Sequence, residues 1–153
     1  MSMFIDIARS RHSCRAFVSS PLTRNEQGLI LEAGGLAPSA RNRRPVKLIP
    51  VEDADAIRAL AGCKDSGTTA LETASFAVIV AADQGLADTW VEDASIAATM
   101  MQLEAEDLGL GSCWIHIRLR KLDGGSAEEA VRRAAGVDPE LGILCIVAFG
   151  RKA

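Results

Sequence analysis

The chain has 153 residues, 48% of them hydrophobic, and a formal net charge of -3 at pH 7. This length and composition predict a single domain, residues 1–153, built around one core. The acidic balance excludes a general attraction to nucleic acid, so a basic cluster in this chain is expected to be a local anion site. The four cysteines and two histidines lack metal-ligand spacing, and we expect no metal.

The apolar runs of the sequence and the surroundings of its cysteines indicate where in the cell the protein is located. The longest strictly apolar run, Phe76 to Ala82, is far shorter than the roughly 20 residues that span a membrane as a helix. Asp6 and Arg9 leave no apolar stretch of signal-peptide length near the N-terminus. Cys113 and Cys145 lie in apolar surroundings, in which a reduced thiol behaves as a small hydrophobe. We therefore expect a soluble, cytoplasmic protein.

The first quarter of the chain is predicted to be largely helical. Met3 to Ser10 has apolar residues at helical spacing and ends directly before a basic cluster. Thr23-Arg24-Asn25-Glu26 is a capping box, in which a hydroxyl and a carboxylate satisfy amides at the start of a helix. That helix is expected to end at Gly34-Gly35, because Pro38 follows. Residues 38–42 are then a post-helix loop.

A short strand and a helix are predicted next. Val46 to Val51 is predicted to be a short strand that Pro50 confines to a sheet edge or to a strand end, since proline cannot donate to a ladder. Asp53 is expected to cap a helix that runs through Ala61 and turns its apolar residues inward. The apolar run from Phe76 to Ala82 fits an interior strand buried on both faces.

The second half of the chain is dominated by one long helix. A second capping box, Thr89-Trp90-Val91-Glu92, opens it, and no charged residue occurs from Ala94 to Leu103. Apolar residues occupy two sides of this helix, so it cannot be satisfied by facing a single core. It is either central in a monomer or pressed against a partner. Its many alanines favour close approach of another helix, and we predict a homodimer interface along it.

The remaining elements alternate between strand and helix. Ser112 to Ile117 and Ile143 to Phe149 are predicted strands. Between them, the capping box Ser126-Ala127-Glu128-Glu129 starts a helix that stops at Gly136. This alternation predicts a sheet covered by helices on both faces.

The most informative stretch is Arg11-His12-Ser13-Cys14-Arg15. Each arginine can offer a planar fork of N–H donors to an anionic oxygen, and the Ser13 hydroxyl can add a short hydrogen bond. The stretch predicts a clamp for the phosphate of a cofactor. The alternative is a solvated basic face at the end of a short helix. Two further segments favour the clamp, Ala37-Pro38-Ser39-Ala40-Arg41-Asn42-Arg43-Arg44-Pro45 and Asp107-Leu108-Gly109-Leu110-Gly111-Ser112-Cys113-Trp114-Ile115.

Together, and in this order, the three segments resemble the flavin-dependent nitroreductase family. That family has an Arg-x-Ser-x-Arg element, then a Pro-Ser-x-x-Asn loop, then a Gly-Leu-Gly-x-x-Trp turn. The resemblance runs from Ile7 to about Gly150. It implies an α+β fold with three α/β/α layers, a central mixed sheet, helices on both faces and a dimeric assembly.

The resemblance also implies a site for FMN that two subunits share. The N-terminal clamp would hold the phosphate, the loop would contact the flavin bound to the other subunit, and the glycine turn would pass close to the ring. Gly109 could instead serve only as a helix C-cap, and Trp114 is expected in the core. The cofactor-binding residues implied are Arg11, His12, Ser13, Arg15, Pro38, Ser39, Asn42, Gly109, Leu110, Gly111 and Arg151.

The implied activity is that of an FMN-dependent oxidoreductase that uses NADH or NADPH. Hydride would pass to the flavin, and a small-molecule acceptor such as a nitroaromatic or quinone would then take the electrons in ping-pong fashion. No protein acid or base is required, so no catalytic residue is assigned. The alternatives are a flavin-binding or storage protein with little turnover, a reductive dehalogenase or substrate oxidase on the same scaffold, and a structural dimer whose clamp holds an adventitious anion.

Two departures from the family pattern are visible. Arg44-Pro45-Val46 stands where the family commonly has Gln-Pro-Trp, so a fixed cation replaces an amide and the pocket is expected to prefer anionic groups. The chain ends at Ala153, directly after the last strand, where family members usually continue into an arm that wraps the partner subunit. We therefore expect a short member with a weaker flavin site, in which Arg151 and Lys152 substitute for the basic residues of that arm.

Overall fold

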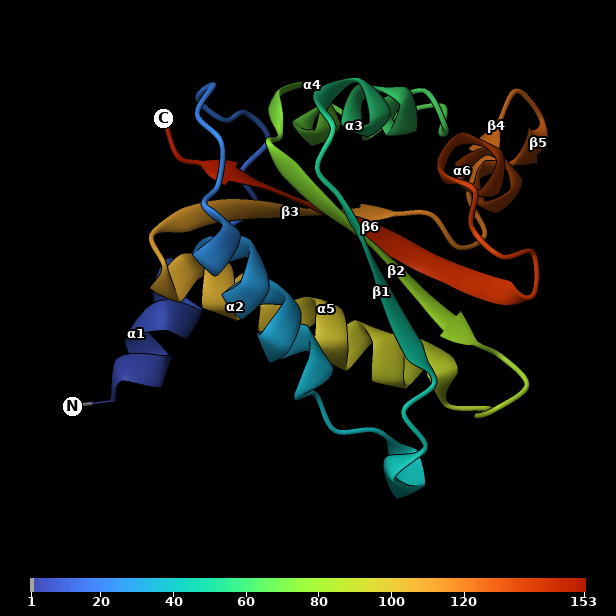
Figure 1. The fold of residues 1–153 in the computed structure, drawn as a ribbon, viewed down its shortest axis with the longest axis horizontal. Coiled ribbons are helices and arrows are strands. Elements are labelled where there is room, and N and C mark those ends of the chain that lie inside the picture. The colour runs from blue at the N-terminus through green and yellow to red at the C-terminus, as the bar shows by residue number, and fades with distance from the viewer. Residues whose placement is uncertain (1) are drawn as a thin grey trace.

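The computed structural model describes residues 2–153 and has three layers (Figure 1). The middle layer is a four-stranded sheet with the order β1 (Val46–Val51), β2 (Phe76–Asp83), β6 (Leu141–Arg151) and β3 (Leu110–His116). All three strand pairings are antiparallel, so the sheet is antiparallel rather than mixed. The alternation of helices and strands in the sequence does not predict whether neighbouring strands are parallel or antiparallel, because a helix can connect strands that run in either direction.

Helices cover both faces of the sheet, which confirms the predicted α+β architecture (Figure 1). On one face lie α3 (Ala54–Ala61), α4 (Ala70–Thr73) and α6 (Ala127–Ala135). On the other face lie α2 (Arg24–Gly35) and α5 (Trp90–Asp107). Each helix layer packs an apolar stripe on the sheet, and the two buried clusters share the central strands.

The remaining elements are short. Helix α1 (Met3–Ser10) contacts α5 and has no buried residue. A 3-10 turn, η1 (Ala40–Asn42), follows α2, and a two-stranded ribbon of β4 (Lys121–Leu122) and β5 (Gly125–Ser126) precedes α6. The sequence pattern missed η1, α4 and the ribbon, because elements of two to four residues are too short to show periodicity.

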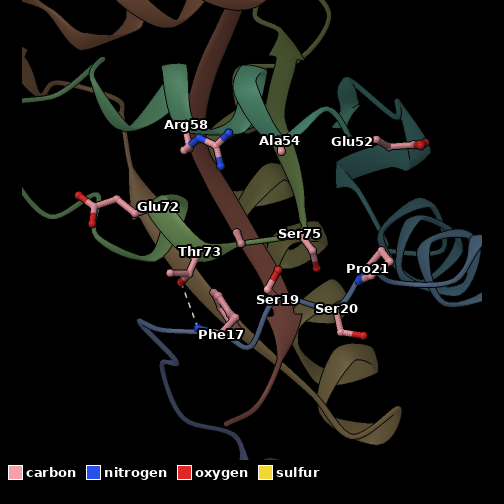
Figure 2. A pocket seen from close by; sticks show the side chains of 11 residues that line it. Phe17, Ser19, Ser20, Pro21, Glu52, Ala54, Arg58, Glu72, Thr73 and Ser75 are labelled. Carbon is pink, nitrogen blue, oxygen red and sulfur yellow. Dashed lines mark hydrogen bonds between the residues drawn. The ribbon is translucent and has the colours of Figure 1, made fainter.

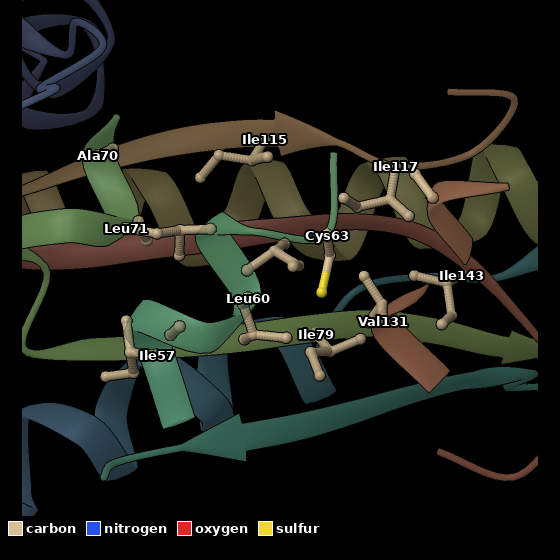
Figure 3. Close-up of a cluster of buried hydrophobic side chains, with 14 of the residues drawn as sticks. Ile57, Leu60, Cys63, Ala70, Leu71, Ile79, Ile115, Ile117, Val131 and Ile143 are labelled. Atoms are coloured by element: carbon tan, nitrogen blue, oxygen red, sulfur yellow. The ribbon is translucent and has the colours of Figure 1, made fainter. Parts of the chain in front are cut away.

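The interior strands confirm the reading of the apolar runs. Every residue from Phe76 to Ala82 is fully buried, since β2 lies between two other strands and under helices on both sides. Figure 3 shows side chains from α3, α4 and α6 packed against this sheet, where they meet Ile79 of β2. Strand β1 is an edge strand, as Pro50 required.

Capping follows the prediction at two helices. Thr23 and Glu26 form the full capping box of α2, and the Asp53 carboxylate accepts from Ala56 N to cap α3. At α6 the Ser126 hydroxyl accepts from Glu129 N, but the Glu129 carboxylate turns to Arg132 instead of returning to Ser126.

The predicted capping box at Thr89 is wrong. Helix α5 does begin at Trp90, but Thr89 makes no capping bond to its first turn. Its hydroxyl donates instead to the Asp93 carboxylate, at 3.0 Å. A buried carboxylate one turn into the helix is the stronger acceptor, and Asp93 is 3% exposed.

Helix α5 has two different sides, as its apolar pattern indicated. Ala94, Ala98 and Met101 are fully buried against α2 and the sheet, whereas Ile96 is 40% exposed. At the crossing, a Cβ on Gly34 of α2 would lie 2.8 Å from the Met101 Cγ, so only glycine permits this approach. No helix among residues 2–153 combines the length and the apolar character needed to cross a bilayer.

Candidate functional site

The N-terminal cluster is held in an extended conformation along the end of the sheet. Cys14 N donates to Ser112 O at 2.9 Å, and Ser13 forms an isolated parallel bridge with Ser112. A few residues later, Val18 N donates to Arg151 O at 3.1 Å. This segment is therefore joined to β3 and β6 by backbone hydrogen bonds, and no periodicity in the sequence predicted this pairing.

Extended backbone explains the Arg-x-Ser-x-Arg spacing. Alternate residues of such a segment point to the same side. The side chains of His12 and Cys14 meet on one side, with 3.4 Å between His12 Nε2 and Cys14 Sγ. By the same alternation, the side chains of Arg11, Ser13 and Arg15 point to the opposite side from those of His12 and Cys14. Within residues 2–153 neither arginine makes a salt bridge, so the two guanidinium groups are available to an external anion.

His12 is held in place by contacts of both its ring nitrogens. Its ring Nδ1 lies 3.1 Å from Ser10 O, which favours the tautomer that donates from Nδ1. Its Nε2 can then accept from the Cys14 thiol. The ring is exposed, and in this tautomer it offers no free N–H donor to a phosphate.

The two basic residues at the end of the chain, Arg151 as the last residue of β6 and Lys152 after it, are both paired with carboxylates. Both Arg151 terminal nitrogens bond Glu26, at 3.2 and 2.9 Å, and Nη2 also donates to Pro21 O. Lys152 Nζ lies 2.8 Å from the Glu106 carboxylate, whose side chain is 10% exposed. Burial raises the pKa of Glu106, but hydrogen bonds from Lys152 and Ser10 outweigh it and the pKa is lowered. A phosphate contact from Arg151 stays a prediction that would require the Glu26 pair to open.

Glycines beneath the cluster make room for it. A Cβ on Gly111 would lie 2.8 Å from Cys14 Sγ and 3.0 Å from the Phe17 ring, and Phe17 also lies against Gly150. The space that the missing Gly111 side chain leaves is thus taken by the clamp segment. Gly109 has a φ of +76° directly after α5, which is the backbone of a helix C-terminus and requires glycine. Leu110 is 1% exposed and pairs with Arg151 in the sheet.

A buried polar pair under the clamp was missed by the sequence analysis. Gln102 is 7% exposed and Ser112 is 2% exposed, and Gln102 Nε2 lies 3.4 Å from Ser112 Oγ. The pair connects α5 to the β3 residue that bridges Ser13. The signal in the sequence that could have revealed this pair was Gln102, because its amide interrupts the apolar and small residues of α5.

The second predicted segment, the loop after α2, is held by its own network. Asp93 Oδ1 accepts from Ala40 N at 3.0 Å, which ties the loop to the start of α5. Ser39 Oγ accepts from Arg44 N at 2.9 Å, and Asn42 Oδ1 accepts from Arg44 Nε at 3.0 Å. Asp93 is the other functional candidate that sequence reasoning missed. Its signal was an acid one turn after Thr89, at the start of a helix with no further charge before Glu104.

This loop is strained as well as bonded. Arg41, Asn42 and Arg44 have φ of 53°, 54° and 52°, in the left-handed region that side chains other than glycine disfavour. Such backbone persists only where surrounding contacts over-determine it, and it is frequent at ligand sites. Asn42 and Arg44 are both exposed, so the loop presents their side chains to the outside.

The clamp and the loop lie at opposite ends of α5. Asp93 holds the loop near the N-terminus of the helix, and Glu106 binds Lys152 near its C-terminus, beside Ser10. The thirteen residue steps from Asp93 to Glu106 span about 20 Å at the rise of an α-helix. Figure 1 shows the same separation, with α1 on one side of the molecule and the turn after α2 on another. One chain therefore does not bring the two predicted halves of the site together.

A separate hollow lies beside Phe17, and Figure 2 shows its lining. Its volume is about 360 Å³. Phe17 N donates to Thr73 Oγ1 there at 3.0 Å, and the buried Ser75 hydroxyl has no hydrogen-bond partner among residues 2–153. Apart from Phe17, the lining comes from residues 19–21, 52–58 and 72–75, none of which belongs to the predicted site.

Trp114 and His116 form a stacked pair on β3. The ring centroids are 6.2 Å apart at 13°, and Trp114 Nε1 donates to His116 Nδ1 at 3.3 Å. Burial lowers the pKa of His116, and the cations of Arg120, Lys64 and Arg118 lower this pKa further. Trp114 packs against the apolar cluster on the α2 and α5 face, in agreement with its predicted place in the core.

Comparisons with known proteins agree with the three motifs. The model of the nitroreductase family matches residues 8–77 and 64–151. A protein of Archaeoglobus fulgidus, described as a candidate NADH dehydrogenase/NAD(P)H nitroreductase, is 30% identical over 145 residues, which are 92% of this chain and 80% of that protein.

Solved structures show the same fold. An FMN-dependent nitroreductase of Clostridium difficile R20291 has a TM-score of 0.94 at 35% identity, over 97% of this chain and 87% of that one. A candidate nitroreductase of Desulfovibrio desulfuricans, solved in complex with FMN, has a TM-score of 0.84 at 25% identity, over 100% of this chain and 88% of that one. This chain belongs to the nitroreductase family.

Proposed function

We propose that this protein is an FMN-dependent oxidoreductase that takes electrons from NADH or NADPH and reduces a small acceptor such as a nitroaromatic or a quinone. The observation that carries the proposal is the clamp. Its extended backbone gives Arg11, Ser13 and Arg15 a common side, and neither guanidinium group forms a salt bridge with any of residues 2–153. The FMN named for two similar solved structures supports the choice of cofactor.

The donor set fits FMN. A phosphate requires cations and hydroxyls, which the clamp supplies, and charge-assisted hydrogen bonds of this kind are about twice as strong as neutral ones. A flavin ring requires directional donors, and Asn42 and Ser39 supply an amide and a hydroxyl on a loop fixed by Asp93. In the glycine turn, Gly109 is exposed and has no side chain to hinder a ring, whereas Gly111 is buried beneath Cys14 and Phe17.

When bound, FMN would supply the hydride and electron transfer between the nicotinamide donor and the acceptor. The chain's own residues would have three tasks. The two arginines would anchor the phosphate, the Asp93 network would hold the ring-binding loop in its strained conformation, and the glycine turn would leave one side of the site open to successive substrates. No side chain is needed as an acid or base.

We also propose that the site is completed in a homodimer. The clamp and the loop lie about 20 Å apart along α5, so a second copy must deliver its loop to the clamp of the first. Exposed apolar side chains support such a contact, since Phe4 on α1 is 58% exposed and Ile96 on α5 is 40% exposed. Between them, Met100 and Leu103 line an apolar hollow with Phe4. Burial of such a surface is a driving force for association.

The deciding experiment is anaerobic mixing of the purified protein with each nicotinamide cofactor. The protein should be yellow, and the flavin absorbance should bleach on mixing and return when an acceptor is added. A yellow protein that neither donor bleaches would indicate flavin storage. A colourless protein that takes up no FMN on titration would refute the proposal. Sedimentation should give a dimer, and a monomer with full flavin affinity would refute the shared site.

A further inference from the structure

Cations gather on the loop that is proposed to reach the flavin ring. Arg41, Arg43, Arg44 and Lys47 are all exposed, and within residues 2–153 none of them makes a salt bridge. The chain as a whole carries a net charge of -3. Four unpaired cations in seven residues therefore create a local field opposite in sign to that of the molecule.

Arg44 is the cation whose position is fixed best. Its backbone N donates to Ser39 Oγ and its side chain Nε donates to Asn42 Oδ1. The residue also has a φ of 52°, which the loop network imposes. Its guanidinium is thus coupled to the two residues proposed to contact the ring. Nε is used in this contact, and the terminal nitrogens remain free to bind an external anion.

A hollow beside the loop carries the same charge. Arg44 and Lys47 line a hollow of about 270 Å³, together with Ser39 and Asp93. The lining holds two cations, Arg44 and Lys47, against one carboxylate, that of Asp93, whose Oδ1 accepts from Ala40 N and whose Oδ2 accepts from Thr89 Oγ1. Arg41 and Arg43 line a second hollow on the other side of the loop, where Asp88 is the acidic residue.

Within one chain these cations lie at the opposite end of α5 from the clamp, and in the proposed dimer their loop carries the residues assigned to the flavin ring, whereas the phosphate is assigned to Arg11, Ser13 and Arg15. We propose that they select substrates, so that the site favours the donor or acceptor that carries an additional anionic group, a phosphate or a carboxylate. The inference rests on the proposed function and assigns Arg44 as the main specificity-determining residue, with Lys47 beside it.

The test compares matched substrates on flavin-loaded protein. For the acceptor, 4-nitrobenzoate is compared with neutral 4-nitrobenzyl alcohol. For the donor, NADPH is compared with NADH, which lacks the 2′-phosphate. We expect the member with more negative charge to have the higher kcat/KM in at least one pair, and R44Q to reduce the ratio of the two kcat/KM values about threefold to tenfold. The ratio should also decrease as salt rises from 20 to 300 mM, because exposed charges are screened.

A binding measurement provides a readout apart from turnover. Calorimetry should show tighter binding of benzoate than of benzyl alcohol to the oxidised flavin-loaded protein, and R44Q and K47Q should remove the difference. The matched control is R133Q, which removes an exposed arginine from α6 on the other face of the sheet. This control should keep the wild-type ratios.

The outcomes separate the two proposals. A yellow protein that NAD(P)H bleaches, but that treats charged and neutral substrates alike in both pairs, overturns the inference and leaves the proposed function intact. Equal losses in R44Q and R133Q also overturn it, because the effect would then be one of net charge. Protein that takes up no flavin overturns both proposals.

Discussion

Arg151 at the end of β6 and Glu26 at the start of α2 form a two-pronged ion pair, with 3.2 and 2.9 Å between the guanidinium nitrogens and the carboxylate oxygens. Glu26 also completes the α2 capping box by accepting from Thr23 N. One carboxylate thus caps a helix and anchors the last strand. Its hydrogen bonds from Arg151 and Thr23 lower the pKa of Glu26, against the effect of burial.

E26Q should therefore destabilise the protein at pH 7 by about 1 to 2 kcal/mol, from the lost ion pair and the weakened cap. Because the folded-state pKa of Glu26 is lowered, its contribution is complete above the unfolded value near 4.5 and is lost as pH falls through the folded value. Urea unfolding at pH 7 and pH 3 should show the difference between wild type and E26Q shrinking in acid. D55N, which breaks the exposed pair with Arg58, should change stability by no more than about 0.5 kcal/mol.

Removing either clamp arginine should weaken FMN binding without unfolding the protein. R11A and R15A each delete a charge-assisted contact of roughly 1.5 to 3 kcal/mol, or about tenfold to a hundredfold in Kd. Fluorescence titration of the flavin-free protein measures the affinity, and circular dichroism checks the fold. R133A is the matched surface control. Unchanged affinity in both clamp variants would contradict the phosphate assignment.

Loss of the Asp93 carboxylate should release the strained loop. D93A removes the acceptors for Ala40 N and the Thr89 hydroxyl, at a cost of about 1.5 to 3 kcal/mol in stability. The loop offers trypsin two sites, after Arg41 and Arg43, since Pro45 protects the bond after Arg44, and native-state cleavage at these two sites should accelerate. T89A, which removes only the hydroxyl bond, should leave the cleavage rate near that of wild type. An equal acceleration in T89A would show that Asp93 does not act through Ala40.

Two glycine-to-alanine changes should have opposite signs. A Cβ at Gly111 would lie within 3.0 Å of Cys14 and Phe17, so G111A should push the clamp segment away and cost about 1 to 3 kcal/mol. Gly28 is helical and has nothing within 4 Å of its Cβ position, so G28A should stabilise by about 0.4 to 1 kcal/mol. Urea midpoints measure both changes. A neutral G111A would mean that the clamp segment yields freely.

Protonation of His116 should be visible in the fluorescence of Trp114. The lowered pKa of His116 places its titration below 6.5, and protonation removes the acceptor for Trp114 Nε1. Since the unfolded chain binds this proton more readily, stability should decrease as pH drops below 6.5 and level off below the folded-state pKa. W90F leaves Trp114 as the lone indole for this measurement, and H116Q should abolish the transition. A midpoint above 6.5 would contradict the burial argument.

Periodicity and local signals predicted most of the scaffold. Helix α1 and strand β1 have the predicted bounds, and Pro50 correctly placed β1 at the edge. These features depend on residues near in sequence. The antiparallel direction of the sheet and the bridge between Ser13 and Ser112 depend on long-range pairing, which has no local signature.

The candidate site was predicted by residue type but not by arrangement. The three motifs indicated the right segments, yet the sequence could not show that Arg151 is taken up by Glu26 or that Cys14 covers Gly111. The role of Asp93 was not predicted because its carboxylate accepts a hydrogen bond from the Ala40 amide, 53 residues away in the sequence. Thr89 was misassigned for the same reason, since its hydroxyl turns to that buried acid and not to the first helical turn.

The distance between the clamp and the loop along α5 has a genetic consequence if two copies share each crevice. A chain lacking Arg11 and a chain lacking Asn42 would pair into a particle with one doubly damaged crevice and one that is whole. Two alleles that are each inactive alone would then restore one another when co-expressed, which a pocket contained within a single chain would not allow.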